Sequence, residues 1–376
     1  MVRSDLSSLP AYVPGATLPN ALKLASNEGT YSPLPSVARA IEQATSNLNR
    51  YPDMGAVDLR QKFADWLNST TGTQAPAAQT DRGGSAEEAA AGLNLTMDNI
   101  AVGNGSSALC LQLIQATCAA GEEVVFAWRS FEAYPILSRI AEATPVPVPL
   151  TADQRHDLPA MVDAITDNTR LIFVCNPNNP TGTTVTAEEF HEFMAAVPDR
   201  VTVVLDEAYV EFNQAQDGPT LADVFTRYPN VAVCRTFSKA YGLAGLRLGY
   251  LIGHEELVQA VNKVAVPFGV NALAQAAGLA SLDAHDELHE RVEETVTQRN
   301  RVTEWLQEHA SVRVYPSEAN FVWLGLGDKA EALDAALKEH DIVARCFAGE
   351  GVRISVTNKE ETDRLLDVLQ KVAAYL

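Results

Sequence analysis

Short runs of apolar, often β-branched residues alternate with amphipathic stretches of helical length through the central two-thirds of the chain. Two runs, at 171–174 and 201–205, are apolar at almost every position, which is typical of strands buried on both faces of a mostly parallel sheet. The expected strands are Asn99–Val102, Glu123–Ala127, Arg170–Cys175, Val201–Asp206, Val231–Thr236 and Leu248–Ile252. The expected helices are Leu109–Cys118, Phe131–Ala143, Leu158–Ile165 and Ala187–Ala196. This alternation predicts a doubly wound α/β fold.

The pattern changes after residue 275, where a long polar helix is followed by short strands and two further helices. These elements predict a smaller α+β domain and are expected at 282–309, 312–314, 320–324, 330–339, 342–345, 352–356 and 362–375. Five prolines before residue 36 predict an irregular N-terminal arm. We therefore expect an arm (1–35), a large domain (36–270) and a small C-terminal domain (271–376). Small polar residues predominate at 68–94, which predicts a mobile surface insertion in the large domain.

Composition narrows the classes of function. Asp and Glu number 48 against 28 Lys and Arg, and the resulting net charge of −20 disfavours nucleic acid and anionic membranes as partners. The chain has no long apolar run, so no membrane span is expected. Five scattered cysteines without a Cys-x-x-Cys pair indicate a reducing cytoplasm rather than a disulfide scaffold or a zinc ribbon. His285 and His289 lie four apart, but on an expected polar helix, so we expect no metal site.

Lys239 is the main candidate for covalent chemistry. It follows an expected strand in the segment Thr236-Phe237-Ser238-Lys239-Ala240-Tyr241-Gly242, where hydroxyl groups and glycines surround it. A lysine that is held by a rigid loop and partly desolvated can form a Schiff base with a carbonyl compound. The alternative is an ordinary turn lysine, which is the more common case for an isolated Ser-Lys pair.

Two more polar segments follow expected strands. Asp206 ends one strand at the edge where open α/β sheets bind ligands, and a buried carboxylate there needs a cationic partner. A protonated pyridine nitrogen is such a partner, whereas the alternative role is a cap for the next helix. The segment Asn176-Pro177-Asn178-Asn179-Pro180-Thr181-Gly182 offers amide groups at the same edge, although this composition is also common in plain turns.

A glycine-containing loop, Gly103-Asn104-Gly105-Ser106-Ser107, joins an expected strand to an apolar helix. The backbone N–H groups at such a helix start can bind an anion. The loop lacks the third glycine of a dinucleotide-binding fingerprint and the Gly-Lys-Ser/Thr of a Walker loop. By itself it is therefore only a weak indication of a phosphate site.

These motifs occur in a specific order, and an arginine follows eight residues beyond the lysine. In that order they resemble the pyridoxal-phosphate aminotransferases of fold type I, and within them the histidinol-phosphate aminotransferase branch. The segments 128–132, 171–180 and 206–211 resemble its actinobacterial aromatic (phenylalanine) aminotransferase subgroup. The resemblance extends from 23–28 to 351–355, and only the 68–94 insertion departs clearly. It implies pyridoxal 5'-phosphate as cofactor, a large domain with a mostly parallel seven-stranded sheet that binds it, and a smaller α+β domain.

The resemblance also implies a role for each matching residue. Lys239 would hold the cofactor as a Schiff base and then transfer protons, and Asp206 would keep the pyridine nitrogen protonated. Asn179 and Tyr209 would hydrogen-bond the phenolic oxygen of the ring. Phe131 would stack on the ring where relatives usually carry a tyrosine. The phosphate would be bound by Ser106, Ser107, Thr236, Ser238 and Arg247.

The remaining matches concern the subunit partner and the substrate. Tyr51 resembles the tyrosine that reaches the cofactor phosphate of a neighbouring subunit, which implies a homodimer. Arg353 resembles the arginine that binds the α-carboxylate of the substrate. Tyr12 and Tyr31 are expected to line the pocket for the substrate side chain, and Arg345 is a candidate for a second anion site.

The favoured function is transamination of aromatic amino acids (phenylalanine, tyrosine, tryptophan), with 2-oxoglutarate and glutamate as the other pair. The alternative is the histidinol-phosphate aminotransferase of histidine biosynthesis, in which Arg345 could contribute to binding the substrate phosphate. A decarboxylase on the same scaffold also stays open, because the sequence does not show which bond at Cα is broken. A non-enzymatic regulator is disfavoured by the acidic charge and by the short stretch before the aminotransferase pattern.

Overall fold

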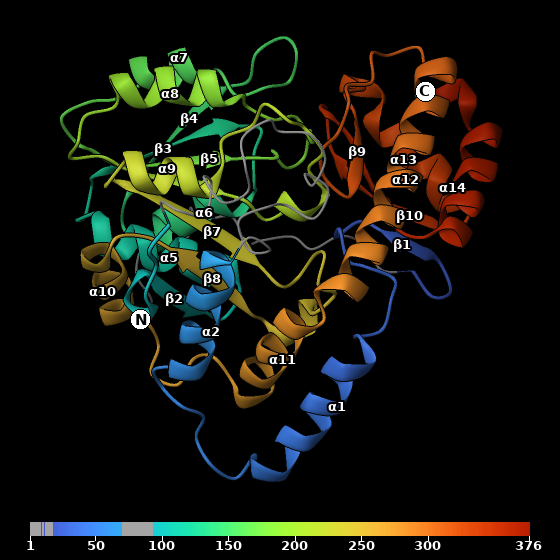
Figure 1. Cartoon of the computed structure of the whole chain (residues 1–376). Helices are drawn as coiled ribbons and strands as arrows, with labels where there is room; N and C mark the ends of the chain where they lie inside the picture. Colours follow the sequence, from blue (N-terminus) through green and yellow to red (C-terminus); the bar gives the residue numbers. More distant parts are fainter. Residues whose placement is uncertain (1–8, 10, 12–17, 70–92) are drawn as a thin grey trace, which may run out of the picture.

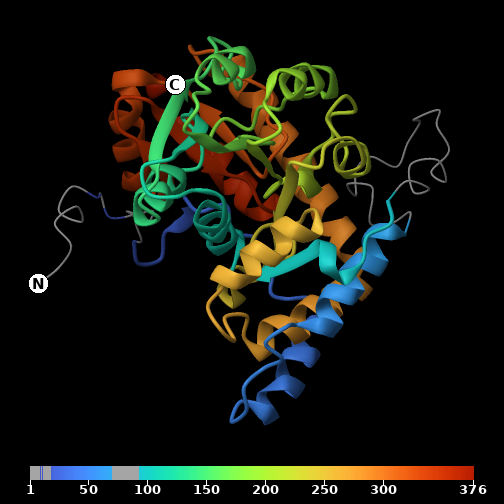
Figure 2. The ribbon, with the colours of Figure 1, turned by 90° about the vertical axis from the view of Figure 1, so that its left-hand side faces the viewer.

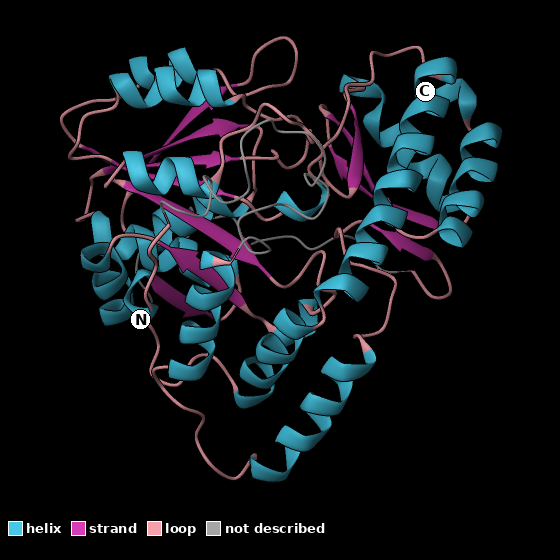
Figure 3. Ribbon diagram, viewed as in Figure 1, coloured by secondary structure: helices cyan, strands magenta, loops and turns pink. Residues whose placement is uncertain are grey.

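The computed structural model describes residues 9, 11, 18–69 and 93–376, whose strands form two separate sheets (Figure 1, Figure 3). The larger sheet has the strand order β2-β8-β7-β6-β5-β3-β4, and the smaller has the order β1-β10-β11-β9. The strands of the larger sheet are β2 (Ile100–Gly103), β3 (Glu123–Trp128), β4 (Thr144–Pro149), β5 (Thr169–Cys175), β6 (Thr202–Asp206), β7 (Val231–Thr236) and β8 (Gly249–Ile252). Those of the smaller sheet are β1 (Leu22–Leu24), β9 (Phe321–Leu324), β10 (Ile342–Phe347) and β11 (Gly351–Ser355).

Helices precede, separate and follow these strands. The α-helices are α1 (Pro35–Ala44), α2 (Val57–Asn68), α5 (Ser106–Thr117), α6 (Ala133–Ile140), α7 (Leu158–Asp163), α8 (Ala187–Ala196), α9 (Leu221–Arg227), α10 (Glu255–Val264), α11 (Ala272–Asp283), α12 (His285–His309), α13 (Ala330–Glu339) and α14 (Lys359–Lys371). The short 3-10 helices are η2 (Thr45–Asn47), η3 (Met97–Asn99), η4 (Val210–Phe212), η5 (Ala244–Leu246), η6 (Gly327–Lys329) and η7 (Ala373–Tyr375).

The larger sheet is parallel apart from β8, which pairs antiparallel with both β2 and β7. Helices cover both of its faces. On one face α5, α6 and α10 enclose a core that includes Leu109, Phe126 and Phe173, and on the other α2, α7, α8 and α9 enclose a core that includes Phe63 and Phe190. The mostly parallel seven-stranded sheet implied by the resemblance is therefore confirmed.

The edge strand β4 is the part of this sheet that the apolar pattern does not predict. Its sequence, Thr-Pro-Val-Pro-Val-Pro, carries a proline at every second position. A proline has no N–H to donate, and prolines in a sequence normally argue against a strand. An edge strand needs donors on one side only, and β4 pairs with β3 alone, so the fold accepts prolines here.

The smaller sheet includes residues from near both ends of the described chain. β1 pairs in parallel with β10, with Leu22 opposite Ile342. The N-terminal stretch, predicted to be irregular, thus supplies a strand, whereas the strand expected at 312–314 is not formed. α12 runs from the end of α11 toward the smaller sheet, and α1 and α11 lie side by side at one end of the molecule (Figure 1, Figure 2).

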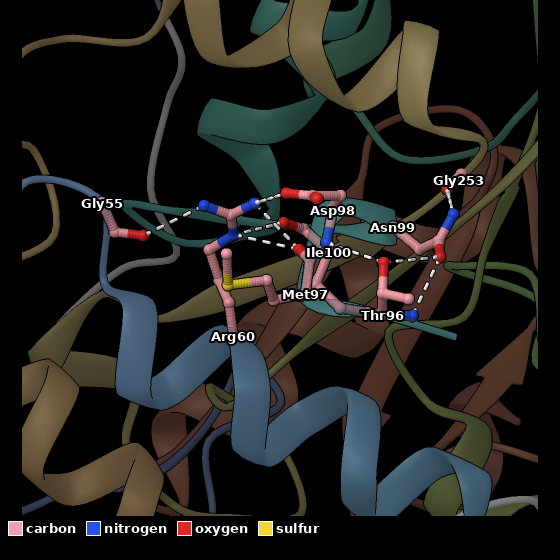
Figure 4. A network of polar contacts seen from close by, with 8 residues as sticks. All are labelled: Gly55, Arg60, Thr96, Met97, Asp98, Asn99, Ile100 and Gly253. Atoms are coloured by element: carbon pink, nitrogen blue, oxygen red, sulfur yellow. Dashed lines mark hydrogen bonds and ion pairs between the residues drawn. The ribbon is translucent and has the colours of Figure 1, made fainter. Parts of the chain in front are cut away.

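Arg60 on α2 ties this helix to the beginning of the larger sheet (Figure 4). Its guanidinium group donates to the main-chain oxygens of Met97 and Ile100, each at 2.8 Å, and to that of Gly55 at 3.4 Å. One arginine thereby connects the loop before α2, the turn η3 and the strand β2. The loop on which Tyr51 lies is held against the sheet at its Gly55 end.

Some expectations lie outside the described residues, namely Tyr12 and most of the 68–94 insertion. The boundaries of the arm and of the two domains remain predictions. Among the described residues, no helix combines the length and apolar character that crossing a membrane requires.

Candidate active site

A cavity of about 650 Å³ opens at the carboxyl ends of β5, β6 and β7. Parallel strands bring the loops that follow them to one edge of a sheet, and three of the predicted polar segments follow these strands. The predicted residues that line the cavity are Ser106, Ser107, Phe131, Asn179, Asp206, Tyr209, Thr236, Ser238, Lys239, Arg247, Arg345 and Arg353. Residues from distant parts of the sequence are thus brought to one site.

Lys239 lies three residues beyond the end of β7 and is partly buried. Its Nζ donates to the main-chain oxygen of Ser26 at 2.9 Å and lies 5.9 Å from the centre of the Tyr209 ring. Burial, reinforced by the positive charge of Arg353, lowers the pKa of Lys239 to about 7. A substantial fraction of this amine is therefore neutral and nucleophilic near neutral pH.

Asp206 is the last residue of β6 and is buried. The Tyr134 hydroxyl donates to its Oδ2 at 2.6 Å, whereas Oδ1 has no hydrogen-bond partner among the described residues. Burial raises the pKa of Asp206 to about 6, against the opposing effect of the Tyr134 hydroxyl. A buried carboxylate with a free oxygen, on a cavity wall, is suited to a cationic hydrogen-bond donor of a ligand.

The segment that follows β1 connects the two sheets at the cavity. Asn27 Nδ2 donates to the Tyr209 hydroxyl at 2.9 Å, and Asn27 Oδ1 accepts from Ser355 Oγ at 2.9 Å. Arg353, on β11, donates to Asn179 Oδ1 and to the main-chain oxygen of Ala25. Asn27 has a φ of 56°, a left-handed conformation that asparagine tolerates better than most residues.

One end of the cavity is built as an anion site. Ser106 and Ser107 begin α5, where main-chain N–H groups lack helical acceptors. The Arg247 guanidinium donates to Ser107 Oγ at 3.4 Å and to Ser238 Oγ at 3.3 Å. Arg247 comes close to Gly105, where an added Cβ would lie 2.4 Å from Nη2 and would displace the guanidinium group. Gly105 also has a φ of 83°, which glycine adopts without strain.

Another part of the cavity lining combines an apolar wall with an ion pair. Phe131 and one side of α6 present apolar groups, namely Ala133, Ile136, Leu137 and Ile140. Next to them, Arg345 on β10 donates through Nη2 and Nε to both oxygens of Glu132, at distances from 2.8 to 3.2 Å. The cavity therefore has a cationic, hydroxyl-rich end and a mainly apolar side.

Two predicted tyrosines lie elsewhere. Tyr31 does not line the cavity, because its hydroxyl donates to Glu294 on α12. Tyr51 is 81% exposed and stacks on Phe268, with ring centres 4.5 Å apart. The site also contains residues to which the sequence assigned no role, namely Ser26, Asn27, Glu132 and Tyr134. For Asn27 the signal was present, since it lies in one of the segments that carry the resemblance.

A family model for class I and II aminotransferases matches residues 19–369. An aromatic amino acid aminotransferase from Corynebacterium jeikeium is 61% identical over 99% of this chain and 94% of its own length. One from Corynebacterium glutamicum is 54% identical over the whole of both chains.

Solved structures with the same fold include a histidinol-phosphate aminotransferase from Sinorhizobium meliloti in complex with pyridoxal-5'-phosphate. It is 29% identical, covers 94% of this chain and 90% of its own, and superimposes with a TM-score of 0.79. An aspartate aminotransferase from Thermotoga maritima has a TM-score of 0.83 at 19% identity, over 99% of this chain and 100% of its own, a likeness of fold alone.

Proposed function

Because this chain belongs to the family of class I and II aminotransferases, we propose that it transfers the amino group of aromatic amino acids to 2-oxoglutarate, with pyridoxal phosphate as cofactor. The substrate class rests on the relatives above 50% identity, which are named aromatic amino acid aminotransferases. The structural observation that carries it is the apolar wall of Phe131 and α6 beside Lys239 in one cavity.

The side chains of the cavity fit this cofactor. The start of α5, together with Ser238 and Arg247, offers donors for a phosphate. Asp206 offers its free Oδ1 to a protonated pyridine nitrogen, and Lys239 offers an amine of lowered pKa to an aldehyde. When bound, pyridoxal phosphate supplies an electron-accepting ring for the bond that is broken at Cα of the amino acid.

Lys239 has two tasks in this proposal. Its neutral amine would hold the cofactor covalently, and once released by the substrate amine the same group would take a proton from Cα and return one. Both tasks need a lysine that loses its proton near neutral pH, and burial provides this. The hydrogen bond to the main-chain oxygen of Ser26 orients Nζ within the cavity.

Asp206 and Tyr209 would each tune the cofactor. The carboxylate of Asp206 would hold a proton on the ring nitrogen, and Tyr134 fixes the orientation of that carboxylate through Oδ2. Tyr209 and Asn179 would face the phenolic oxygen, in agreement with their positions on the cavity wall. Asn27 orients the Tyr209 hydroxyl.

Arg353 is the proposed partner of the substrate α-carboxylate. It is buried on β11, and a guanidinium group can bind a carboxylate through two parallel hydrogen bonds. The substrate ring would then lie along the apolar wall, where burial of its surface favours binding.

Histidinol phosphate is the second candidate donor. Its support is the 29% identical structural relative and the presence of Arg345 on the cavity wall. The ion pair with Glu132 disfavours it, because the carboxylate already neutralises the arginine that would bind the phosphate.

The proposed active unit is a homodimer. Supporting it are exposed apolar side chains in the segments 48–54 and 266–268, which are joined by the stacking of Tyr51 on Phe268, namely Leu48, Tyr51, Met54, Val266 and Phe268. Tyr51, Val266 and Met54 are 81%, 73% and 64% exposed, and gathered apolar side chains of this kind commonly mark an interface. A cytoplasmic location is proposed on the support of the five cysteines, all of which are free thiols.

The deciding experiment measures kcat/KM for phenylalanine, tyrosine, tryptophan and histidinol phosphate, each with 2-oxoglutarate. We expect a higher kcat/KM for phenylalanine than for histidinol phosphate. The ratio of the two values reports the enzyme's preference at the transition state. If histidinol phosphate exceeded phenylalanine by more than about tenfold, or about 1.4 kcal/mol, the aromatic assignment would be wrong.

A further inference from the structure

The ion pair between Glu132 and Arg345 lies beside the apolar wall of the cavity. Arg345 lines the cavity, while Glu132 is the residue immediately before α6, the helix that supplies most of this wall. We propose that Glu132 is a specificity-determining residue: it neutralises Arg345 and so weakens binding of an anionic group at the end of the side chain, that of 2-oxoglutarate included, relative to an aromatic ring. This inference rests on the proposed aminotransferase function and goes beyond it by naming the residue that selects between donor classes.

The register of the smaller sheet explains why a carboxylate is needed at this position. Arg345 and Arg353 are directly opposite each other on the antiparallel strands β10 and β11, so their side chains leave the same face of the sheet. Like charges placed opposite one another repel. Arg353 donates to Asn179 Oδ1 and to the Ala25 oxygen, and Arg345 donates to the carboxylate of Glu132.

The geometry of the pair makes the neutralisation effective. Arg345 donates to both Glu132 oxygens, and the two side chains are only 13% and 24% exposed. Screening by water is weaker at such a position than on an open surface. An anionic group that reaches Arg345 must therefore compete with Glu132 for the guanidinium group or be repelled by the Glu132 carboxylate. An uncharged aromatic ring contacts only the apolar wall.

A second ion pair on the same strand hairpin provides a matched control. Arg129 is paired with Glu350, which lies in the turn between β10 and β11, and its Nε donates to Glu350 Oε2 at 2.8 Å. Neither residue lines the cavity. Glu350→Gln thus weakens the contact between the loop after β3 and the hairpin without altering the charge of the cavity wall.

The test compares holoenzyme of wild type, Glu132→Gln, Glu132→Asp and Glu350→Gln. The primary measurement is the ratio of kcat/KM for histidinol phosphate to that for phenylalanine. We expect Glu132→Gln to raise this ratio by about tenfold or more and to lower the KM for 2-oxoglutarate, as removal of one nearby charge implies. Glu132→Asp keeps the charge and Glu350→Gln lies outside the cavity, so both should keep the wild-type ratio.

Equilibrium binding of two unreactive carboxylates, 3-phenylpropionate and maleate, gives a readout independent of turnover. Glu132→Gln should strengthen binding of the dianion maleate and leave that of the monoanion nearly unchanged. An unchanged ratio with unchanged maleate affinity would overturn the inference, and so would an equal change in Glu350→Gln. If the wild-type enzyme fails to turn over phenylalanine, the proposed function is contradicted instead. The affinities for maleate and 3-phenylpropionate then decide the role of Glu132.

Discussion

Removal of the Asp206 charge should stabilise the protein without its cofactor. The carboxylate is buried, and its Oδ1 has no partner among the described residues. Burial raises the pKa of Asp206 from 3.8 to about 6, and this rise corresponds to a cost of roughly 3 kcal/mol to the folded apoprotein above pH 6. Asp206→Asn removes the charge and keeps an oxygen that can accept from the Tyr134 hydroxyl.

The pH dependence follows from the direction of this shift. Below pH 3.8 the carboxyl is protonated in both the folded and the unfolded state, so wild type and variant should have similar free energies of unfolding. The wild type should lose stability relative to the variant as pH rises from 3.8 to about 6, and the difference should stay constant above that.

Urea unfolding of both apoproteins at several pH values measures this difference, and the same experiment with the cofactor bound gives the contrast. Bound cofactor should reverse the order, because its protonated nitrogen would pair with the Asp206 carboxylate and the variant would lack that pair. A variant apoprotein that is less stable than wild type at pH 7.5, or a difference independent of pH, would refute the reasoning.

Two further predictions concern the subunit interface and a second buried carboxyl. Mixing inactive Lys239→Ala chains with impaired Tyr51→Phe chains should yield more activity than either parent, since one site of the heterodimer combines both wild-type residues; confirmed subunit exchange without a gain counts against shared sites. Glu211 is buried in η4, its Oε2 has no partner among the described residues, and burial raises its pKa from 4.5 to about 7. Glu211→Gln should therefore raise the free energy of unfolding by up to about 3 kcal/mol above pH 7, and this gain should decrease as pH falls toward 4.5. A gain that persists at pH 4.5 would show that burial of the ionised carboxylate is not its cause.

The sequence predicted the elements that carry a continuous apolar signal. Six strands of the larger sheet were predicted within a few residues of their observed bounds, because burial on both faces leaves little room for polar side chains. β4 and β1 lie in proline-containing stretches and form because a partner strand is available, which local pattern does not record. Residues 312–314 contain the apolar side chains that predicted a strand, but they form none because no other strand of the described chain pairs with them.

In the cavity too, some residues were predictable from local sequence, whereas others depend on partners far away in the chain. Residues at strand ends, such as Asp206 and Lys239, were predictable because a parallel sheet gathers those ends at one edge. Tyr31 was expected in the substrate pocket, but its hydroxyl donates to Glu294 on α12, a pairing that the sequence does not show. Tyr134 and Glu132 were missed for a related reason, since their partners are 72 and 213 positions away in the chain.

The parallel pairing of β1 with β10 has a consequence for the timing of folding during synthesis. Asn27 and Ser355, which bond to each other at the cavity, are separated by 328 positions. At about 5–20 residues per second, a ribosome needs roughly 15 to 70 s to add the chain between them. During that interval β1 has no strand to pair with, and the segment that orients Lys239 and Tyr209 lacks its supports. The larger sheet can therefore form early, but a competent catalytic centre arises only after the chain through Ser355 has left the ribosome.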